Sequence, residues 1–202
     1  MNTRNLLLVA AIAVALALTA PAFAGKGQIP QLPEDTIETC ICTKAATIDV
    51  PGLGTFDAQL RGSISVGSFN VNVATDGTRN LPLNVKGYNE RGYVDGLGET
   101  TVWLDKSRPV TGSFLREITP GTGFPAVQEM HMHFMMITEG LPGRMFRTLE
   151  PVILRSEAVD SFPPPKGTRY EPVTEVVFED VENPGVLAVR ITDVSVKVAG
   201  AD

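Results

Sequence analysis

The sequence predicts an all-β protein: an antiparallel β-sandwich or, alternatively, a distorted β-barrel, with little or no helix after an N-terminal leader. Short runs rich in β-branched residues recur along the chain, and Gly, Pro, Asn and Asp separate them. Apolar and polar residues alternate within these runs, as in strands that bury one face. After the leader, no stretch of helical length shows a clean apolar period near 3.6 residues.

Residues 1–24 have the three parts of a cleavable signal peptide. Arg4 supplies a positive charge, and Leu6 to Leu18 form an uncharged apolar run. Small residues at Ala22 and Ala24 suit a signal peptidase that cuts before Gly25. The apolar run is shorter than the roughly 20 residues of a membrane-spanning helix. We therefore expect an exported protein, periplasmic or extracellular, that has no membrane span.

The charge balance of the mature chain argues against a nucleic-acid partner. The full sequence has 202 residues with 17 Lys and Arg and 23 Asp and Glu. Removal of the leader takes away Arg4 and leaves a formal charge of −7. The basic residues are spread along the chain and interrupted by acids, whereas phosphate binding needs them clustered.

A single domain over 44–202 is expected to follow an irregular arm at 25–43, which Pro30 and Pro33 interrupt. A chain of this size can bury about 70% of its unfolded surface, enough for one core. The strands are predicted near 44–50, 55–66, 68–75, 81–87, 99–105, 110–118, 127–138, 146–155, 172–180 and 186–198. Three consecutive prolines predict a loop over 160–169.

Two of these strands keep their alternation only with a shift of one residue. A bulge at Gly67-Ser68 is predicted to keep the following apolar residues on the core face: Ile64, Val66, Phe69, Val71 and Val73. The strand near 186–198 shifts in the same way around Asp193. Such shifts are typical of curved sheets.

The strand at 127–138 carries both histidines of the protein. Its apolar face is predicted as core: Met130, Met132, Phe134 and Met136. The other face carries Glu129, His131 and His133. Same-face neighbours lie roughly 6.5–7 Å apart, so the two imidazoles and the carboxylate are a candidate site for one transition metal ion, Zn, Cu or Fe. The alternative is a pair of partly exposed polar histidines on the solvent side.

Cys40 and Cys42 are the two cysteines, close to the predicted mature N-terminus. Free thiols are rare in oxidising compartments, which favours a local disulfide between them. That disulfide needs a tight turn at Ile41, because extended backbone separates the two Cα atoms by about the upper limit of 6.8 Å. A redox-active pair, a soft-metal dithiolate and bonds to another chain are the alternatives.

The sequence predicts no specific reaction. It has no Gly-x-Ser-x-Gly elbow, and both histidines lie on one strand, which leaves few ways to assemble a catalytic triad. We therefore expect a non-enzymatic binding or structural domain, with a metal-binding protein or metalloenzyme as the alternative. The partner stays open between a protein and a glycan, since Tyr88, Tyr93 and Trp103 are candidates for a sugar-stacking platform.

Overall fold

The computed structural model describes residues 37–199, and these residues form β-strands and loops without a helix. The strands are β1 (Ile37–Val50), β2 (Gly54–Ser68), β3 (Asn72–Val73), β4 (Arg79–Val94), β5 (Gly98–Leu104), β6 (Phe114–Glu117), β7 (Ala126–Met132), β8 (Phe134–Thr138), β9 (Phe146–Thr148), β10 (Val152–Ser156), β11 (Arg169–Pro172), β12 (Val176–Asp180) and β13 (Asn183–Val198). The predicted all-β antiparallel fold is confirmed. The predicted signal peptide at 1–24 and residues 25–36 of the predicted arm lie outside the described part.

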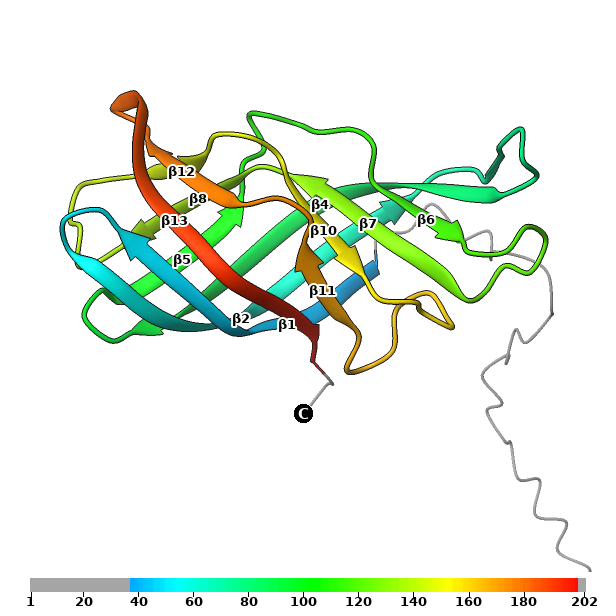
Figure 1. Ribbon diagram of the computed structural model, residues 1–202, viewed down its shortest axis with the longest axis horizontal. Helices are drawn as coiled ribbons and strands as arrows, with labels where there is room; N and C mark the ends of the chain where they lie inside the picture. The colour runs from blue at the N-terminus through cyan, green and yellow to red at the C-terminus, as the bar shows by residue number, and fades with distance from the viewer. Residues whose placement is uncertain (1–36, 200–202) are drawn as a thin grey trace, which may run out of the picture.

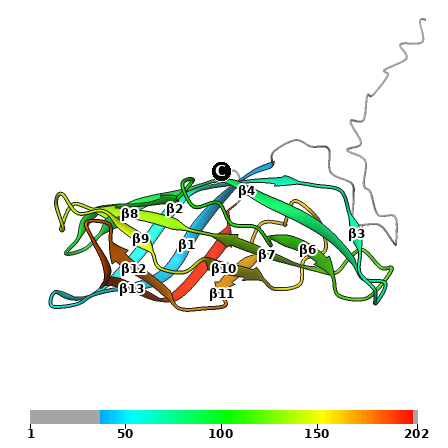
Figure 2. The same cartoon turned by 90° about the horizontal axis from the view of Figure 1, so that it is seen from above.

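The strands form one antiparallel sheet that closes on itself. Eight segments follow one another along the chain: β1, β2, β4, β5 with β6, β7 with β8, β9 with β10, β11 with β12, and β13. Each segment pairs with the next, and β13 pairs back with β1. Only β3 lies off this path, paired with β4. The result is a flattened ring, with β2 and β4 on one side and β13 and β11 on the other (Figure 2).

The ring has two ends because four of its eight segments are broken. At one end β5, β8, β9 and β12 pair in sequence, and at the other β6, β7, β10 and β11 do so. We call these the β8 end and the β7 end (Figure 1). The long strands β1, β2, β4 and β13 run through both. Each end therefore closes its own ring over a shared wall.

The core lies inside the ring, and the strand with the histidines faces it as predicted. Met130, Met132, Phe134 and Met136 are all buried. His131 and His133 lie on the opposite, partly exposed face. The alternation of side chains therefore gave the correct register for this segment.

The phase shift around Asp193 is also found. Asp193 has a φ of 55°, and the pairing of β13 with β1 shifts register beside it. Val189 and Val196, on either side of the shift, are both buried. The bulge thus lets one long strand keep its apolar side chains inside a curved wall.

Two predictions about the first strands are wrong. The arm expected to be irregular up to residue 43 is part of β1 from Ile37 on, paired with β2. Phe69 and Val73, placed in the core by the predicted bulge, are 59% and 67% exposed. After β2 the chain leaves the closed path of strands, since β3 lies off this path and pairs with β4, and of Phe69, Val71 and Val73 only Val71 packs against the core. No helix long and apolar enough to cross a membrane occurs within 37–199.

Candidate binding site

Two neighbouring cavities lie inside the ring. The larger, of about 50 Å³, lies toward the β8 end, and the smaller, of about 20 Å³, toward the β7 end. Tyr88, Leu154 and Val196 line both cavities and separate them. A single water needs roughly 10–15 Å³ on this scale, so both cavities are large enough for water but are small.

The walls of the larger cavity are apolar apart from one polar cluster. Aliphatic and aromatic side chains from both faces of the ring supply most of the wall. Phe134 packs against Tyr88 with ring centroids 4.6 Å apart. Thr43, Tyr88 and Glu90 are the only polar residues in the lining.

Glu90 is the most unusual residue of this cavity. It is 2% exposed, and its Oε2 accepts hydrogen bonds from the Thr43 hydroxyl at 2.7 Å and the Tyr88 hydroxyl at 2.8 Å. Its Oε1 is buried and has no hydrogen-bond partner among the described residues. Buried polar atoms in folded proteins nearly always have a partner, so this oxygen marks a place where one is missing.

The surroundings of Glu90 favour its neutral form. Burial raises the pKa of the Glu90 carboxyl, against the smaller lowering effect of the hydrogen bonds from Thr43 and Tyr88. The pKa of Tyr88 is raised well above its ordinary value, mainly by burial and then by the Glu90 charge. No lysine, arginine or histidine lines the larger cavity.

The sequence places Glu90 inside through the alternation of β4. Tyr88, Glu90 and Val94 are buried at a spacing of two, and Gly92 fills the position between the last two. Gly62 pairs with Glu90 across the β2–β4 ladder. A Cβ at Gly62 would overlap the backbone of Asn89, so glycine permits the close approach of the strands there.

Sequence reasoning missed Glu90. The strand predicted near 81–87 ends before Glu90, and no strand is predicted between 88 and 98. The signal was present, because a period of two counted back from Val94 puts a carboxylate on an apolar face.

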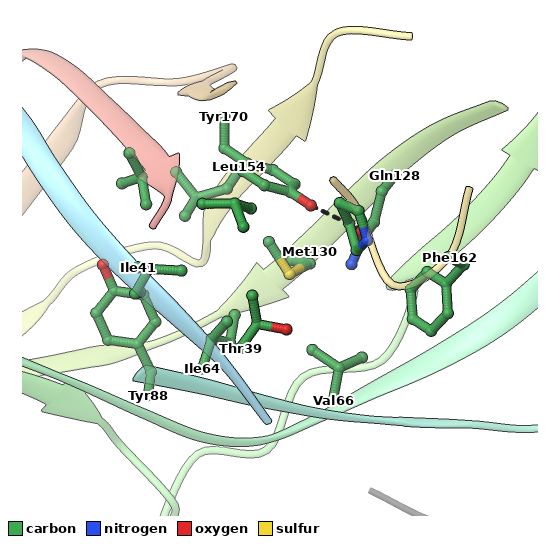
Figure 3. A pocket seen from close by; sticks show the side chains of 13 residues that line it. Thr39, Ile41, Ile64, Val66, Tyr88, Gln128, Met130, Leu154, Phe162 and Tyr170 are labelled. Carbon is green, nitrogen blue, oxygen red and sulfur yellow. Dashed lines mark hydrogen bonds between the residues drawn. The ribbon is translucent and has the colours of Figure 1, made fainter. Parts of the chain in front are cut away.

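The smaller cavity has a different polar group, already paired. Tyr170 donates from its hydroxyl to Oε1 of the buried Gln128 at 2.8 Å. Met130 lies in the middle of the lining residues, and Phe162, from the proline-rich loop, lies at the opposite end of the group from Tyr88 (Figure 3). Figure 3 therefore shows a flexible side chain, Met130, among the residues that line the pocket.

The structure brings the predicted metal ligands near one another, but their side chains make hydrogen bonds with protein groups. His131 Nε2 lies 2.8 Å from Oε1 of Glu129, and Arg155 donates to Oε2 of the same carboxylate at 2.7 Å. Burial opposes ionisation of Glu129, but the hydrogen bonds from His131 and Arg155 hold its pKa below the ordinary value. His133 Nδ1 lies 3.1 Å from the Thr148 hydroxyl. Among the side chains that the structure describes, no three His, Cys, Asp or Glu residues are grouped so as to hold a metal. The metal site stays a prediction.

Both histidines line an outer cavity of about 120 Å³ that also contains Arg108. Burial lowers the pKa of His133, and the positive charge of Arg108 lowers it further. This outer cavity is polar and separate from the interior.

The backbone of both cysteines lies in β1. Ile37 to Thr43 pairs with β2 residue by residue, so the backbone makes no turn at Ile41. The tight turn required by a disulfide between Cys40 and Cys42 is thus missing from the described backbone. Their pairing stays a prediction.

The three aromatic residues proposed as a sugar platform do not share a face. Tyr88 is buried in the ring, whereas Tyr93 is 69% exposed. Trp103 is half-buried beside Met135 in a groove on the outer surface.

Comparison with known proteins gives one similar fold. DynF from the dynemicin biosynthesis pathway of Micromonospora chersina superposes with a TM-score of 0.70 at 20% sequence identity, over 89% of this chain and 86% of that chain. No family model matches the chain, and no curated protein sequence matches it. At this identity the likeness to DynF shows the fold alone.

Proposed function

We propose that the protein is an exported, non-enzymatic binding domain that encloses a small, largely apolar molecule inside its ring of strands. The observation that carries this proposal is the unpartnered Oε1 of Glu90, a residue of a cavity whose lining is apolar apart from Glu90, Thr43 and Tyr88. Ligand sites are typically apolar hollows with a few convergent polar groups, and rings of about eight strands are wide enough to hold one small ligand.

The geometry of the cavities supports a ligand that pushes side chains aside as it enters. The two cavities are too small for an organic molecule as they stand, since a cavity that binds benzene measures roughly 150 Å³. Tyr88, Leu154 and Val196 line both cavities, and Met130 lines the smaller one. An unbranched methionine has three rotatable bonds, so a change of its conformation can enlarge the smaller cavity.

The chemistry of the lining supports binding over catalysis. Acid–base catalysis needs a proton acceptor and donor with pKa values near the working pH. Tyr88 is the other titratable group of the larger cavity, and its raised pKa keeps it protonated. The described lining offers no activated nucleophile beside Glu90.

Methyl NMR of methionine-labelled protein tests the proposal. Ethylbenzene is the probe, and the Met130 methyl reports on the interior, because Met130 lines the smaller cavity. Met135 and Met145 lie on the outer groove and are the controls within the same chain. We expect saturable shifts at Met130 with Met135 and Met145 unmoved. A spectrum that stays unchanged, or that moves only at the two outer residues, would overturn the proposal.

A further inference from the structure

We infer that the interior takes an uncharged ligand with a hydrogen-bond-accepting oxygen, such as a ketone or ester on an apolar body, and that Glu90 donates to this oxygen from Oε1. The inference rests on the proposed function and names the class of ligand for the same site.

The hydrogen bonds of Glu90 determine which of its two oxygens carries the proton. Both hydroxyls that reach the carboxyl, from Thr43 and Tyr88, donate to Oε2. In a neutral carboxylic acid one oxygen accepts and the other carries the proton. Two donors at Oε2 make it the accepting oxygen, so the proton belongs on Oε1.

No cationic side chain in the cavity lining compensates a negative charge on Glu90. The lining of the larger cavity holds no cationic side chain, and the carboxyl is 2% exposed. An ionised Glu90 would therefore be a buried charge without a counter-ion in the cavity lining. Protonation removes that cost, and it leaves an O–H group that points to no acceptor in the described chain.

Ligands of four classes differ in how they interact with this O–H group. A hydrocarbon leaves the donor unpaired, which costs binding energy. An anion adds charge to an apolar cavity beside an acid. An amine must ionise Glu90 and lose its own water, and buried ion pairs seldom recover both costs. A neutral oxygen acceptor completes the hydrogen bonding without any of these penalties.

The test uses three probes of one shape: acetophenone, ethylbenzene and 1-phenylethylamine. Each is titrated into the wild-type protein, Glu90→Gln and Glu90→Leu, and the dissociation constant is read from the methyl groups of Leu154, which lines both cavities. Circular dichroism first establishes that each variant is folded. Glu90→Gln keeps an N–H donor at the Oε1 position but removes the ionisable group, and Glu90→Leu removes the donor.

We expect acetophenone to bind the wild-type protein roughly tenfold more tightly than ethylbenzene, the effect of one satisfied hydrogen bond. Glu90→Gln should keep this preference within about threefold, and Glu90→Leu should abolish it.

Two results would overturn the inference and leave the proposed function standing. Equal binding of the ketone and the hydrocarbon by the wild-type protein would mean that Glu90 makes no bond to the ligand. Tightest binding of the amine, lost in Glu90→Gln, would mean an ionised Glu90 and a cationic ligand. If none of the probes moved the methyl groups of Leu154, the proposed function itself would fail.

Discussion

Glu90 and Glu117 are both buried glutamates of the ring, and their surroundings differ in almost every other respect. Glu117, in β6, accepts hydrogen bonds from the backbone N–H groups of Arg79, Gly121 and Gly123 and from the Arg79 guanidinium. Burial opposes ionisation, but these donors outweigh it and lower the pKa of Glu117 to about 2. Glu90 accepts hydrogen bonds from the hydroxyls of Thr43 and Tyr88, has no cationic side chain in its cavity lining, and its burial moves the pKa the other way.

The difference shows what each carboxyl does for the chain. Glu117 uses both oxygens to fasten the loop after β6 onto β4, so it is a structural group with nothing left to offer a ligand. Glu90 lines the larger cavity, and its Oε1 has no hydrogen-bond partner among the described residues. Both acids expose almost no surface, but Glu90 lies deep in the molecule and Glu117 lies close to its surface, so depth and the number of donors together separate their roles.

The largest predicted effect is on Glu117. Glu117→Gln removes the charge that faces Arg79 and places an amide N–H against backbone donors, so we expect a loss of about 3–5 kcal/mol in the free energy of unfolding. Urea denaturation at pH 7 measures it. The control is Glu175→Gln, since Glu175 pairs with Arg190 on the exposed surface and should cost less than about 1 kcal/mol. Equal losses in the two variants would contradict the structural role of Glu117.

A second prediction compares two buried leucines. Leu115, near Glu117, lines neither interior cavity, whereas Leu154 lines both. Truncation to alanine costs about 2–5 kcal/mol, and more where the side chain is surrounded by atoms on all sides. We expect Leu115→Ala near the upper limit and Leu154→Ala near the lower one. Ethylbenzene should raise the melting temperature of Leu154→Ala more than that of Leu115→Ala, and the reverse order would argue against a hollow interior.

The pH dependence of stability should separate the two acids by sign. For Glu117, the stabilisation is complete above the ordinary pKa of 4.5 and is lost as the pH falls toward 2. For Glu90, the folded pKa is raised, so stability decreases as the pH rises above the ordinary value of 4.5 through the folded pKa. Unfolding free energies from pH 2 to 8 measure both. Glu117→Gln should flatten the acid limb, and Glu90→Gln should flatten the decline at higher pH. A Glu90→Gln curve parallel to the wild-type curve would refute the raised pKa.

Replacement of the two histidines, which lie on the outer face, is expected to change the free energy of unfolding least. The prediction from their spacing is about one equivalent of Zn, Cu or Fe in protein purified from its native envelope. Elemental analysis measures it, with the His131→Ala/His133→Ala double variant as the control. Metal-free native protein, or metal retained by a folded double variant, would end this prediction.

The positions of most strands could be predicted from the sequence, because one face of each strand is apolar and the alternation is local. The breaks within segments could not, since they depend on which partner strand continues. Residues 127–138 were predicted as one strand, but the chain changes partners at His133, from β6 and β10 to β5 and β9. Phe69 shows the same limit: alternation gives a face, and only the sheet opposite decides whether that face is covered.

The candidate site was harder to predict than the fold. The two histidines are candidates from the sequence because imidazoles bind metals, but in the structure they lie on the outer face of the ring. Glu90 is one of 23 acidic residues in the chain and lies outside the predicted strands. Its importance comes from Thr43, which is 47 positions away and reaches it only after β1 and β2 have paired.

The shared wall of β1, β2, β4 and β13 has a mechanical consequence. Because the other four segments are interrupted, the hydrogen bonds at the β8 end can open without breaking those at the β7 end, and the four long strands stay paired throughout. Amide exchange should accordingly be slowest in the long strands and should differ between the two ends. A guest could then enter through one end of the molecule while the other end stays closed.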